Sequence, residues 1–239
     1  MPIDRNSAQY ITGALYKPTQ TSAPGVWDLD DQANNIAKNL WPLPPQAVQR
    51  SLRFNSADSA YLNRTPASAG NRRTWTWSGW IKRSTISTDT DIFGLRIDGN
   101  NQFRFYFNSS DKLDIYNQIS ATIAARIITT QVFRDVSSWY NIVLAIDTTN
   151  GTPGDRLRLY VNGIEIINFD TDTQPSVNYD TQINTTNAHL LGYFGAASFN
   201  GYMSEINFVD GQQLTAARDR KSTRLNSSHV SESRMPSSA

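Results

Sequence analysis

The side chains of this chain that could do chemistry are few and widely spaced. Up to residue 218 the only glutamates are Glu165 and Glu205, which fall in separate predicted strands, and the only histidine is His189. Glycoside hydrolysis needs two carboxylates that flank the scissile bond, and general catalysis most often uses histidine. We therefore predict a non-enzymatic protein in which Glu205 satisfies a hydrogen bond of a turn or loop and His189 is a half-buried residue at a strand end.

Calcium is the metal that the sequence fits best, because hard oxygen ligands suit it. The candidate ligands are two Asp-Thr-Asp pairs next to predicted turns, Asp89 with Asp91 and Asp170 with Asp172. Such pairs are also common in polar loops, where they serve only local hydrogen bonds. The chain has no cysteine, which excludes disulfides, thiol catalysis and cysteine-zinc sites. The glycine-containing loops lack a phosphate-binding spacing, so no nucleotide site is predicted.

Composition argues against a nucleic-acid or membrane partner. The 239 residues carry a formal charge of +1, too small for uniform attraction to a polyanion or an anionic bilayer. The sequence shows no apolar signal region and no stretch of transmembrane length, which predicts neither Sec-type export nor a membrane anchor.

The elements that position these residues are predicted to be strands. Trp75 and Trp77 alternate in the run from residue 73 to 82, which predicts a central strand with one strongly apolar face. Gly79 precedes Trp80, and we predict a bulge there that turns a third indole toward the interior. So many large rings need an opposing layer, and no later helix is long enough to supply it, so the layer should be a second sheet.

Short strands with turn punctuation follow along the rest of the chain. A strand over residues 139–147, apolar on both faces, is predicted to be central, and Asn162-Gly163 is predicted to be a tight hairpin turn. With no long helices between the strands, the sequence predicts an all-β, antiparallel two-sheet sandwich or jelly roll. The other predicted strands are 51–55, 60–64, 91–97, 102–107, weaker strands within 111–134, 156–161, 164–167, 190–194 and 201–209.

Residues 1–49 are predicted to form an N-terminal arm and linker. Residues 27–41 predict one short helix that Asp28 can cap and Pro42 ends, with an apolar stripe too small to form a core. The stripe either packs on its own domain or docks on a neighbouring subunit, and the proline-rich linker 42–45 favours docking.

Residues 219–239 are predicted to be an artefact. The stretch 219–229 can be back-translated into a common sequencing-library adapter, and 232–239 resembles its distal part. A polar disordered tail is the alternative. Removing four Lys/Arg and two Asp/Glu from 22 and 21 leaves 18 and 19, a formal charge of −1 for residues 1–218. The expected domains are thus the arm 1–49, a sandwich 50–218 and the tail 219–239, with any natural sequence beyond 218 missing.

The order of motifs resembles the laminin-G-like, concanavalin A-like lectin/glucanase superfamily. The tryptophan strand is followed by Trp-Tyr-Asn-Ile-Val at 139–143, Leu-Tyr-Val-Asn-Gly at 159–163 and Gly-Tyr-Met-Ser-Glu at 201–205. The resemblance covers about residues 50–216 and implies the fold, with calcium binding in many members. The Glu-x-Asp-x-x-Glu motif of the glucanase branch is absent.

Residues 61–80, together with 24–45, look more narrowly like virion proteins of tailed phages. That resemblance implies a tail-fibre or virion-surface module, located in the virion, with other virion subunits as partners of the arm and a homotrimer as the expected assembly. Three functions follow as hypotheses: a non-catalytic module that binds a cell-surface glycan, a purely structural spacer, or a glycan hydrolase that uses aspartates.

Overall fold

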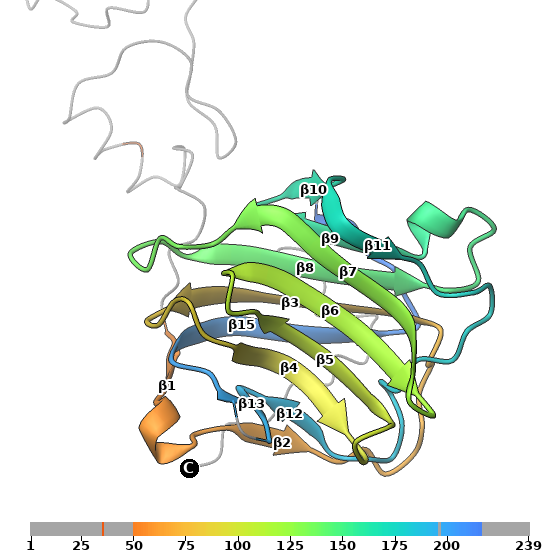
Figure 1. The fold of residues 1–239 in the computed structure, drawn as a ribbon, viewed down its shortest axis with the longest axis horizontal. Helices are drawn as coiled ribbons and strands as arrows, with labels where there is room; N and C mark the ends of the chain where they lie inside the picture. The colour runs from red at the N-terminus through yellow and green to blue at the C-terminus, as the bar shows by residue number, and fades with distance from the viewer. Residues whose placement is uncertain (1–34, 36–49, 196, 217–239) are drawn as a thin grey trace, which may run out of the picture. The chain divides into compact units, whose positions relative to one another are not determined.

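The protein folds into two antiparallel β-sheets packed face to face, as a computed structural model shows for residue 35 and residues 50–195 and 197–216 (Figure 1). The six-stranded sheet has the order β1-β15-β3-β8-β9-β10, and the seven-stranded sheet has the order β11-β7-β6-β5-β4-β12-β2. The all-β sandwich prediction is therefore confirmed. The six-stranded sheet is built from β1 (Leu52–Phe54), β3 (Thr74–Arg83), β8 (Tyr140–Asp147), β9 (Leu157–Val161), β10 (Ile164–Ile166) and β15 (Gly201–Asp210).

The seven-stranded sheet faces the viewer in Figure 1. Its strands are β2 (Leu62–Arg64), β4 (Thr90–Arg96), β5 (Gln102–Phe107), β6 (Lys112–Ile119), β7 (Thr122–Val132), β11 (Phe169–Thr173) and β12 (His189–Leu191). A small hairpin of β13 (Tyr193–Phe194) and β14 (Ala197–Ser198) and two 3-10 turns, η1 (Ser56–Asp58) and η2 (Pro153–Asp155), complete the described elements. Two strands were not predicted from the sequence: β11, whose Phe-Asp-Thr-Asp-Thr sequence is largely polar, and the two-residue β14.

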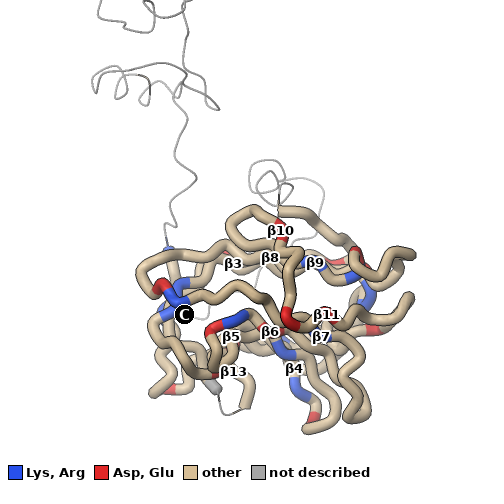
Figure 2. The backbone as a smooth tube through the Cα atoms, turned by 45° about the horizontal axis from the view of Figure 1, so that its top comes forward, with Lys and Arg blue, Asp and Glu red and all other residues tan. Residues whose placement is uncertain are grey.

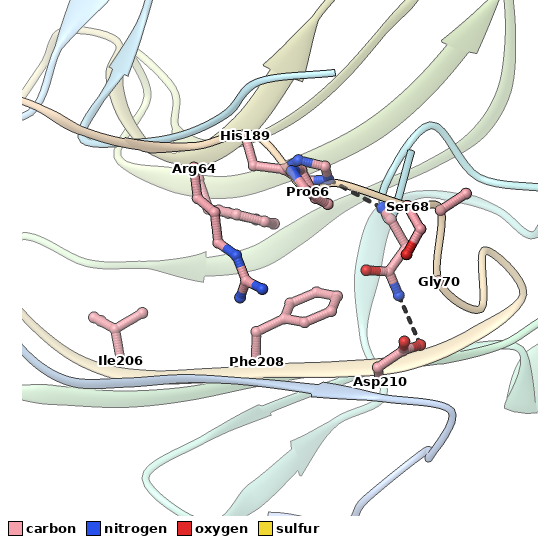
Figure 3. Close-up of a pocket in the computed structure, with 11 residues that line it drawn as sticks. Arg64, Pro66, Ser68, Gly70, His189, Ile206, Phe208 and Asp210 are labelled. Atoms are coloured by element: carbon pink, nitrogen blue, oxygen red, sulfur yellow. Dashed lines mark hydrogen bonds between the residues drawn. The ribbon is translucent and has the colours of Figure 1, made fainter. Parts of the chain in front are cut away.

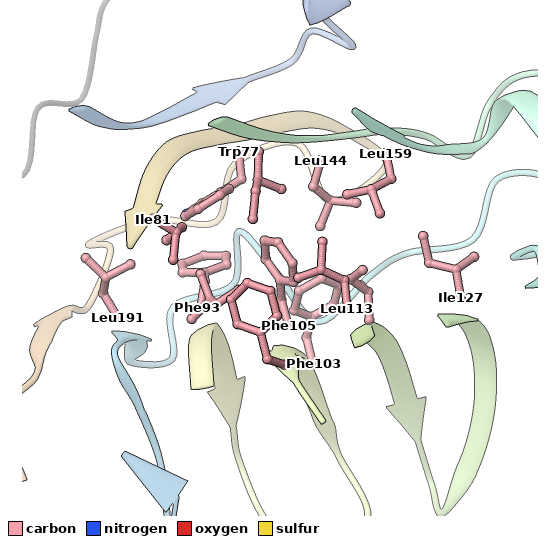
Figure 4. Packing of buried hydrophobic residues seen from close by; sticks show 14 of the residues in the cluster. Trp77, Ile81, Phe93, Phe103, Phe105, Leu113, Ile127, Leu144, Leu159 and Leu191 are labelled. Atoms are coloured by element: carbon pink, nitrogen blue, oxygen red, sulfur yellow. The ribbon is translucent and has the colours of Figure 1, made fainter. Parts of the chain in front are cut away.

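The core between the sheets is aromatic. Trp75 and Trp77 on β3 are fully buried, and β3 lies between β15 and β8, as the alternation predicted. Figure 4 shows Trp77, Leu144 and Leu159 descending from one sheet between the phenylalanines of the other. The rings contact at varied angles: Trp77 is edge-on to Phe105 with centroids 5.2 Å apart. Aromatic burial of this kind stabilises the packing of the two layers.

The predicted bulge at Gly79 is wrong. β3 pairs with β8 without a register shift, and the bulge lies instead in the partner strand β15, between Ser204 and Asn207, where Glu205 has a φ of 51°. Trp80 consequently stays on the outer face and is half-buried. Gly79 leaves room for the bulge, because a Cβ there would lie 2.3 Å from the end of Ile206.

The outer face of the six-stranded sheet is partly covered by the segment that follows β15. The Thr76 hydroxyl accepts a hydrogen bond from the amide of Leu214 at 2.8 Å and donates one to the carbonyl of Gln212 at 2.7 Å. Val143 and Ala145 on this face are buried. This explains why the strand 139–147 is apolar on both sides, and β8 is indeed interior to its sheet, between β3 and β9.

The hairpin turn predicted at Asn162-Gly163 is confirmed. Asn162 and Gly163 both have positive φ, 52° and 82°, and connect β9 to β10 in the predicted hairpin.

Of the helix predicted at 27–41, only Asn35 belongs to the described residues, and it is helical. The rest of the arm and the tail 219–239 lie outside them, and the two boundaries between the predicted domains stay predictions. Within the described residues, no helix reaches the length and apolarity needed to cross a bilayer.

Candidate binding pocket

A pocket of about 270 Å³ opens between the two sheets on the side where β2 and β15 lie (Figure 3). It exists because β1 is short: β1 pairs only with residues 201–203 of β15, so the rest of β15 has no partner on that side among the described strands. Residues of β2, β4 and β12 and two loops close its other walls. The lining consists of Arg64, Pro66, Ser68, Ala69, Gly70, Phe93, Asn184, His189, Ile206, Phe208 and Asp210. We call this the β15 pocket.

The floor of the β15 pocket is apolar. After the bulge at Glu205, the side chains of Ile206, Phe208 and Asp210 alternate onto the face of β15 that lines the pocket. The Phe208 ring stacks on Trp75 with centroids 5.5 Å apart and an interplanar angle of 27°. The buried Trp75 indole therefore backs the Phe208 ring of the floor.

Polar groups at one end of the pocket are held by mutual hydrogen bonds among Asn71, Asn184 and Asp210, which we call the junction. The Asp210 carboxylate accepts hydrogen bonds from the amide of Asn71 at 2.9 Å and from the Asn184 side chain at 2.8 Å. Asn184 also donates to the carbonyl of Asn71 at 2.9 Å, and its own carbonyl accepts from the amide of Gly70 at 2.9 Å. Gly70 is required by this close approach, since a Cβ there would lie 2.4 Å from Asp210 Oδ2.

His189 orients the loop that carries Asn184. Its Nε2 accepts a hydrogen bond from the amide of Asn184 at 3.0 Å, so the proton sits on Nδ1, which donates to the carbonyl of Asn187 at 2.9 Å. Burial lowers the pKa of His189, and the nearby positive charge of Arg64 lowers it further. His189 is thus a neutral, buried wall residue at the start of β12, more buried than the sequence predicted.

Arg64 is the cationic group of the pocket. It is the last residue of β2, and its exposed side chain extends over the floor toward Phe208 (Figure 3). Unlike Arg73, Arg104 and Arg126, it has no carboxylate partner in the part of the chain that the structure describes. The β15 pocket therefore combines an aromatic floor with an arginine, a carboxylate, an amide and a hydroxyl.

The family comparison agrees with the fold. The family model described as the concanavalin A-like lectin/glucanases superfamily matches residues 55–218. The chain belongs to this superfamily. A search of curated proteins finds no match to the domain.

Three solved structures illustrate what this lectin/glucanase-superfamily domain is similar to. A heptameric SAP-like pentraxin from Limulus polyphemus is 18% identical, with a TM-score of 0.48 over 67% of this chain and 74% of that one. Domains LG4-5 of the mouse laminin alpha1 chain are 14% identical, with a TM-score of 0.47 over 66% and 40%. The CBM40 of a Ruminococcus gnavus IT-sialidase, bound to α2,3-sialyllactose, is 12% identical, with a TM-score of 0.47 over 69% and 98%.

The first predicted calcium pair, Asp89 and Asp91, lies on the face of the seven-stranded sheet that points away from the six-stranded sheet. Arg104 binds both aspartates. Arg104 Nε donates to Asp91 at 2.5 Å, and Arg104 Nη1 donates to Asp89 at 3.2 Å. The guanidinium also lies 3.7 Å from the centre of the Tyr106 ring. Acidic and basic positions are interspersed along this lectin-superfamily domain (Figure 2). The two aspartates are thus brought together, with Arg104 as the cation between them.

The second predicted pair lies on β11, an edge strand of the same sheet, with β7, β6 and β5 between it and β4. Asp170 forms an ion pair with Lys112, and Asp172 accepts a hydrogen bond from Gln174 at 2.6 Å. The structure does not bring the two pairs together, and no cluster of three or more metal-ligating side chains occurs among the described residues. Calcium binding by Asp89, Asp91, Asp170 or Asp172 stays a prediction.

Neither glutamate lines the β15 pocket. Glu165 on β10 is bound by Arg158, with two oxygen–nitrogen distances of 2.6 Å. Glu205 is exposed at the β15 bulge, where its carbonyl accepts a hydrogen bond from the Asn207 side chain. The single carboxylate of the pocket, Asp210, was not among the sequence candidates, and neither were Arg64 and Asn184.

The stability of the domain should depend on the ionisation of Asp91. Burial raises the pKa of Asp91 to about 6, against the lowering effect of Arg104. Between pH 4 and 6 the folded state therefore keeps a proton that the unfolded state has lost, so this group makes the domain less stable as pH rises through that window. In the wild-type protein, the free energy of unfolding measured in urea should fall by up to ~3 kcal/mol between pH 4 and 6 because of this group. In Asp91→Asn this fall should be absent. Identical pH slopes in both proteins would contradict this.

Proposed function

We propose that this domain is a non-catalytic carbohydrate-binding module that recognises a cell-surface glycan. The observation that carries the proposal is the β15 pocket, in which the Phe208 ring forms a floor beside Asp210, Asn184 and Ser68. The face of a sugar ring is apolar enough to lie on an aromatic side chain, while its hydroxyls need donors and acceptors at the rim. The volume of about 270 Å³ is near the lower end for ligand pockets and suits a single sugar residue.

The pocket favours binding over hydrolysis. A glycosidase needs two carboxylates on either side of the bond, and the β15 pocket presents one among the residues that the structure describes. The hydrogen-bonded junction of Asn71, Asn184 and Asp210 holds the loops before any ligand arrives. Such preorganisation reduces the entropy lost on binding.

A glycan array tests this function on the full chain. The wild-type protein is expected to bind a defined set of glycans and to release no sugar from them. Ala69→Trp places an indole in the pocket from an exposed loop and should weaken binding at least tenfold, whereas Ala57→Trp, on the exposed turn η1 outside the pocket, should not. No binding by the wild-type protein would favour a structural spacer, and sugar release would favour a hydrolase. Repeating the array with a calcium chelator tests the predicted metal.

The biological setting that we propose is the virion of a tailed phage, on the resemblance of residues 24–45 and 61–80 to virion proteins. In that setting residues 1–49 attach the domain to other virion subunits, and a homotrimer is the expected assembly. The mass in solution of chains 1–218 and 50–218 tests the arm: two monomers would leave it without an assembly role. Sequencing the uninterrupted gene and its neighbours tests the setting, since tail genes should flank it.

A further inference from the structure

The β15 pocket carries two charged side chains, and a neutral sugar would leave the positive one without an anionic partner. Arg64 contributes a positive charge at one end, and Asp210 contributes a negative charge at the other (Figure 3). His189 adds no charge, because its Nε2 accepts the amide hydrogen of Asn184 and its Nδ1 carries the proton. The two charged groups therefore decide which ligands the pocket accepts.

The two charges differ in what already surrounds them. Asp210 Oδ1 accepts two hydrogen bonds, from the amide of Asn71 and from Asn184, and the junction fixes the carboxylate in place. Its Oδ2 takes no hydrogen bond from the described residues and can accept one from a hydroxyl. The guanidinium of Arg64, by contrast, has no carboxylate partner among the described residues. A ligand that interacts with both groups places an anionic group against Arg64, as an ion pair, and a hydroxyl against Asp210, as a hydrogen-bond donor.

We propose that the β15 pocket binds a carboxylate-bearing sugar residue, such as a uronic acid, whose carboxylate pairs with Arg64 while its ring lies on Phe208. A planar carboxylate matches the guanidinium fork in a bidentate pair, which adds orientation as well as affinity. A hydroxyl on the far side of the ring then donates to Asp210 Oδ2. This inference rests on the proposed carbohydrate-binding function and names its ligand class.

The site also discriminates against other anions. The negative charge of Asp210 repels a second anionic group in so small a pocket, so a polyanion such as a phosphorylated or sulfated chain is disfavoured relative to a sugar with a single carboxylate. The aromatic floor needs an apolar ring face, which a small inorganic anion lacks. The combination of one cation, one anion and a ring-sized apolar floor is specific to an acidic sugar.

The test uses the full chain and pairs of glycans that differ only at one carbon. Glycans that end in glucuronic or galacturonic acid are compared with those that end in glucose or galactose, and with the methyl esters of the acids. We expect binding at least tenfold tighter to the acids, and loss of that preference in Arg64→Gln. Arg64→Lys should keep part of the preference, because it keeps the charge but not the fork.

Arg96→Gln is the matched control. Arg96 is also an exposed arginine at the end of a strand of the same sheet, but it does not line the pocket. Its replacement should leave the acid preference unchanged. Equal affinity for acids and neutral sugars, or an unchanged preference in Arg64→Gln, would overturn the inference while leaving carbohydrate binding intact. Absence of binding to every glycan would instead overturn the proposed function, and the inference with it.

Discussion

Replacing Asp111 by asparagine is expected to lower the free energy of unfolding by about 3–5 kcal/mol, the usual cost of leaving one member of a buried ion pair without its partner. Both side chains of the Arg83–Asp111 pair are 0% exposed, and the two groups are 3.0 Å apart. Without the carboxylate, the guanidinium of Arg83 keeps the carbonyl of Phe133 at 2.5 Å and the ring of Phe107 at 4.3 Å. Neither neutralises a buried positive charge.

The pKa values of the pair follow from the same arrangement. Burial lowers the pKa of Arg83. Burial would raise the pKa of Asp111, but hydrogen bonds from the Ser87 amide, Arg134 and Arg83 outweigh it and hold that pKa below its ordinary value. The pair therefore stabilises the domain above the ordinary carboxyl pKa, and this stability is lost as pH falls through the lower folded-state value.

Asparagine is the sharpest replacement because Asp111 has a φ of 64°, a conformation that asparagine tolerates better than alanine. Urea unfolding measures the effect. Arg134→Gln is the control: its side chain is 63% exposed, so loss of its ion pair with Asp111 should cost less than ~1 kcal/mol. Adding Arg83→Met to Asp111→Asn should restore much of the stability, since it removes the uncompensated charge. A loss below about 1 kcal/mol in Asp111→Asn alone would show that water reaches Arg83.

Trp77→Ala is the second large expected effect, a loss of about 3–5 kcal/mol in the free energy of unfolding. The indole is fully buried and stacks on Phe93 at 6.2 Å while meeting Phe105 edge-on. Alanine would leave a cavity between two closely packed sheets, and rings held by several strands cannot collapse into it easily. Denaturant unfolding monitored by circular dichroism measures the change.

Two variants keep this prediction falsifiable. Trp77→Phe keeps a ring and removes the Trp77 Nε1–H, which has no hydrogen-bond partner among the described residues, so it should cost less than ~1.5 kcal/mol. Trp80→Ala, on the half-buried outer face, should also cost clearly less than Trp77→Ala. Equal losses at positions 77 and 80 would mean that the two faces of β3 are assigned wrongly.

The architecture was predictable because it depends on local alternation. Trp75 and Trp77 repeat with period two, and a period-two pattern places side chains on a known face whatever the partner strand is. The bulge predicted at Gly79 departed from this alternation and was wrong, because Gly79 accommodates a bulge in β15, a strand more than a hundred residues away. A single sequence does not show which of two paired strands carries the extra residue.

The pocket was not predictable because its members converge only through topology. Arg64 lies more than a hundred residues before Asn184, and three short strands separate Asn184 from the strand that carries Asp210. None of the three forms a recognisable spacing with another. Asp89 and Asp91 were predicted as metal ligands because nothing near them in the sequence supplies a cation. In the fold, Arg104 of the neighbouring strand β5 supplies it. Alternation of Ile206, Phe208 and Asp210 was the one usable signal, and it identifies a strand face without showing that the face is uncovered.

The place of β15 in the six-stranded sheet also governs how the protein is made. β15 is the last strand of the described residues, yet it lies between β1 and β3, and among the described strands it alone pairs with β1 (Figure 1). On the ribosome, β1 and one edge of β3 therefore wait unpaired, with Trp75 lacking its stack on Phe208, until residue 210 has emerged. Unpaired edges of this kind recruit strands from other chains. We therefore expect the β1–β15–β3 part of the six-stranded sheet to form late in synthesis, and slow insertion of β15 to lower the yield of soluble protein.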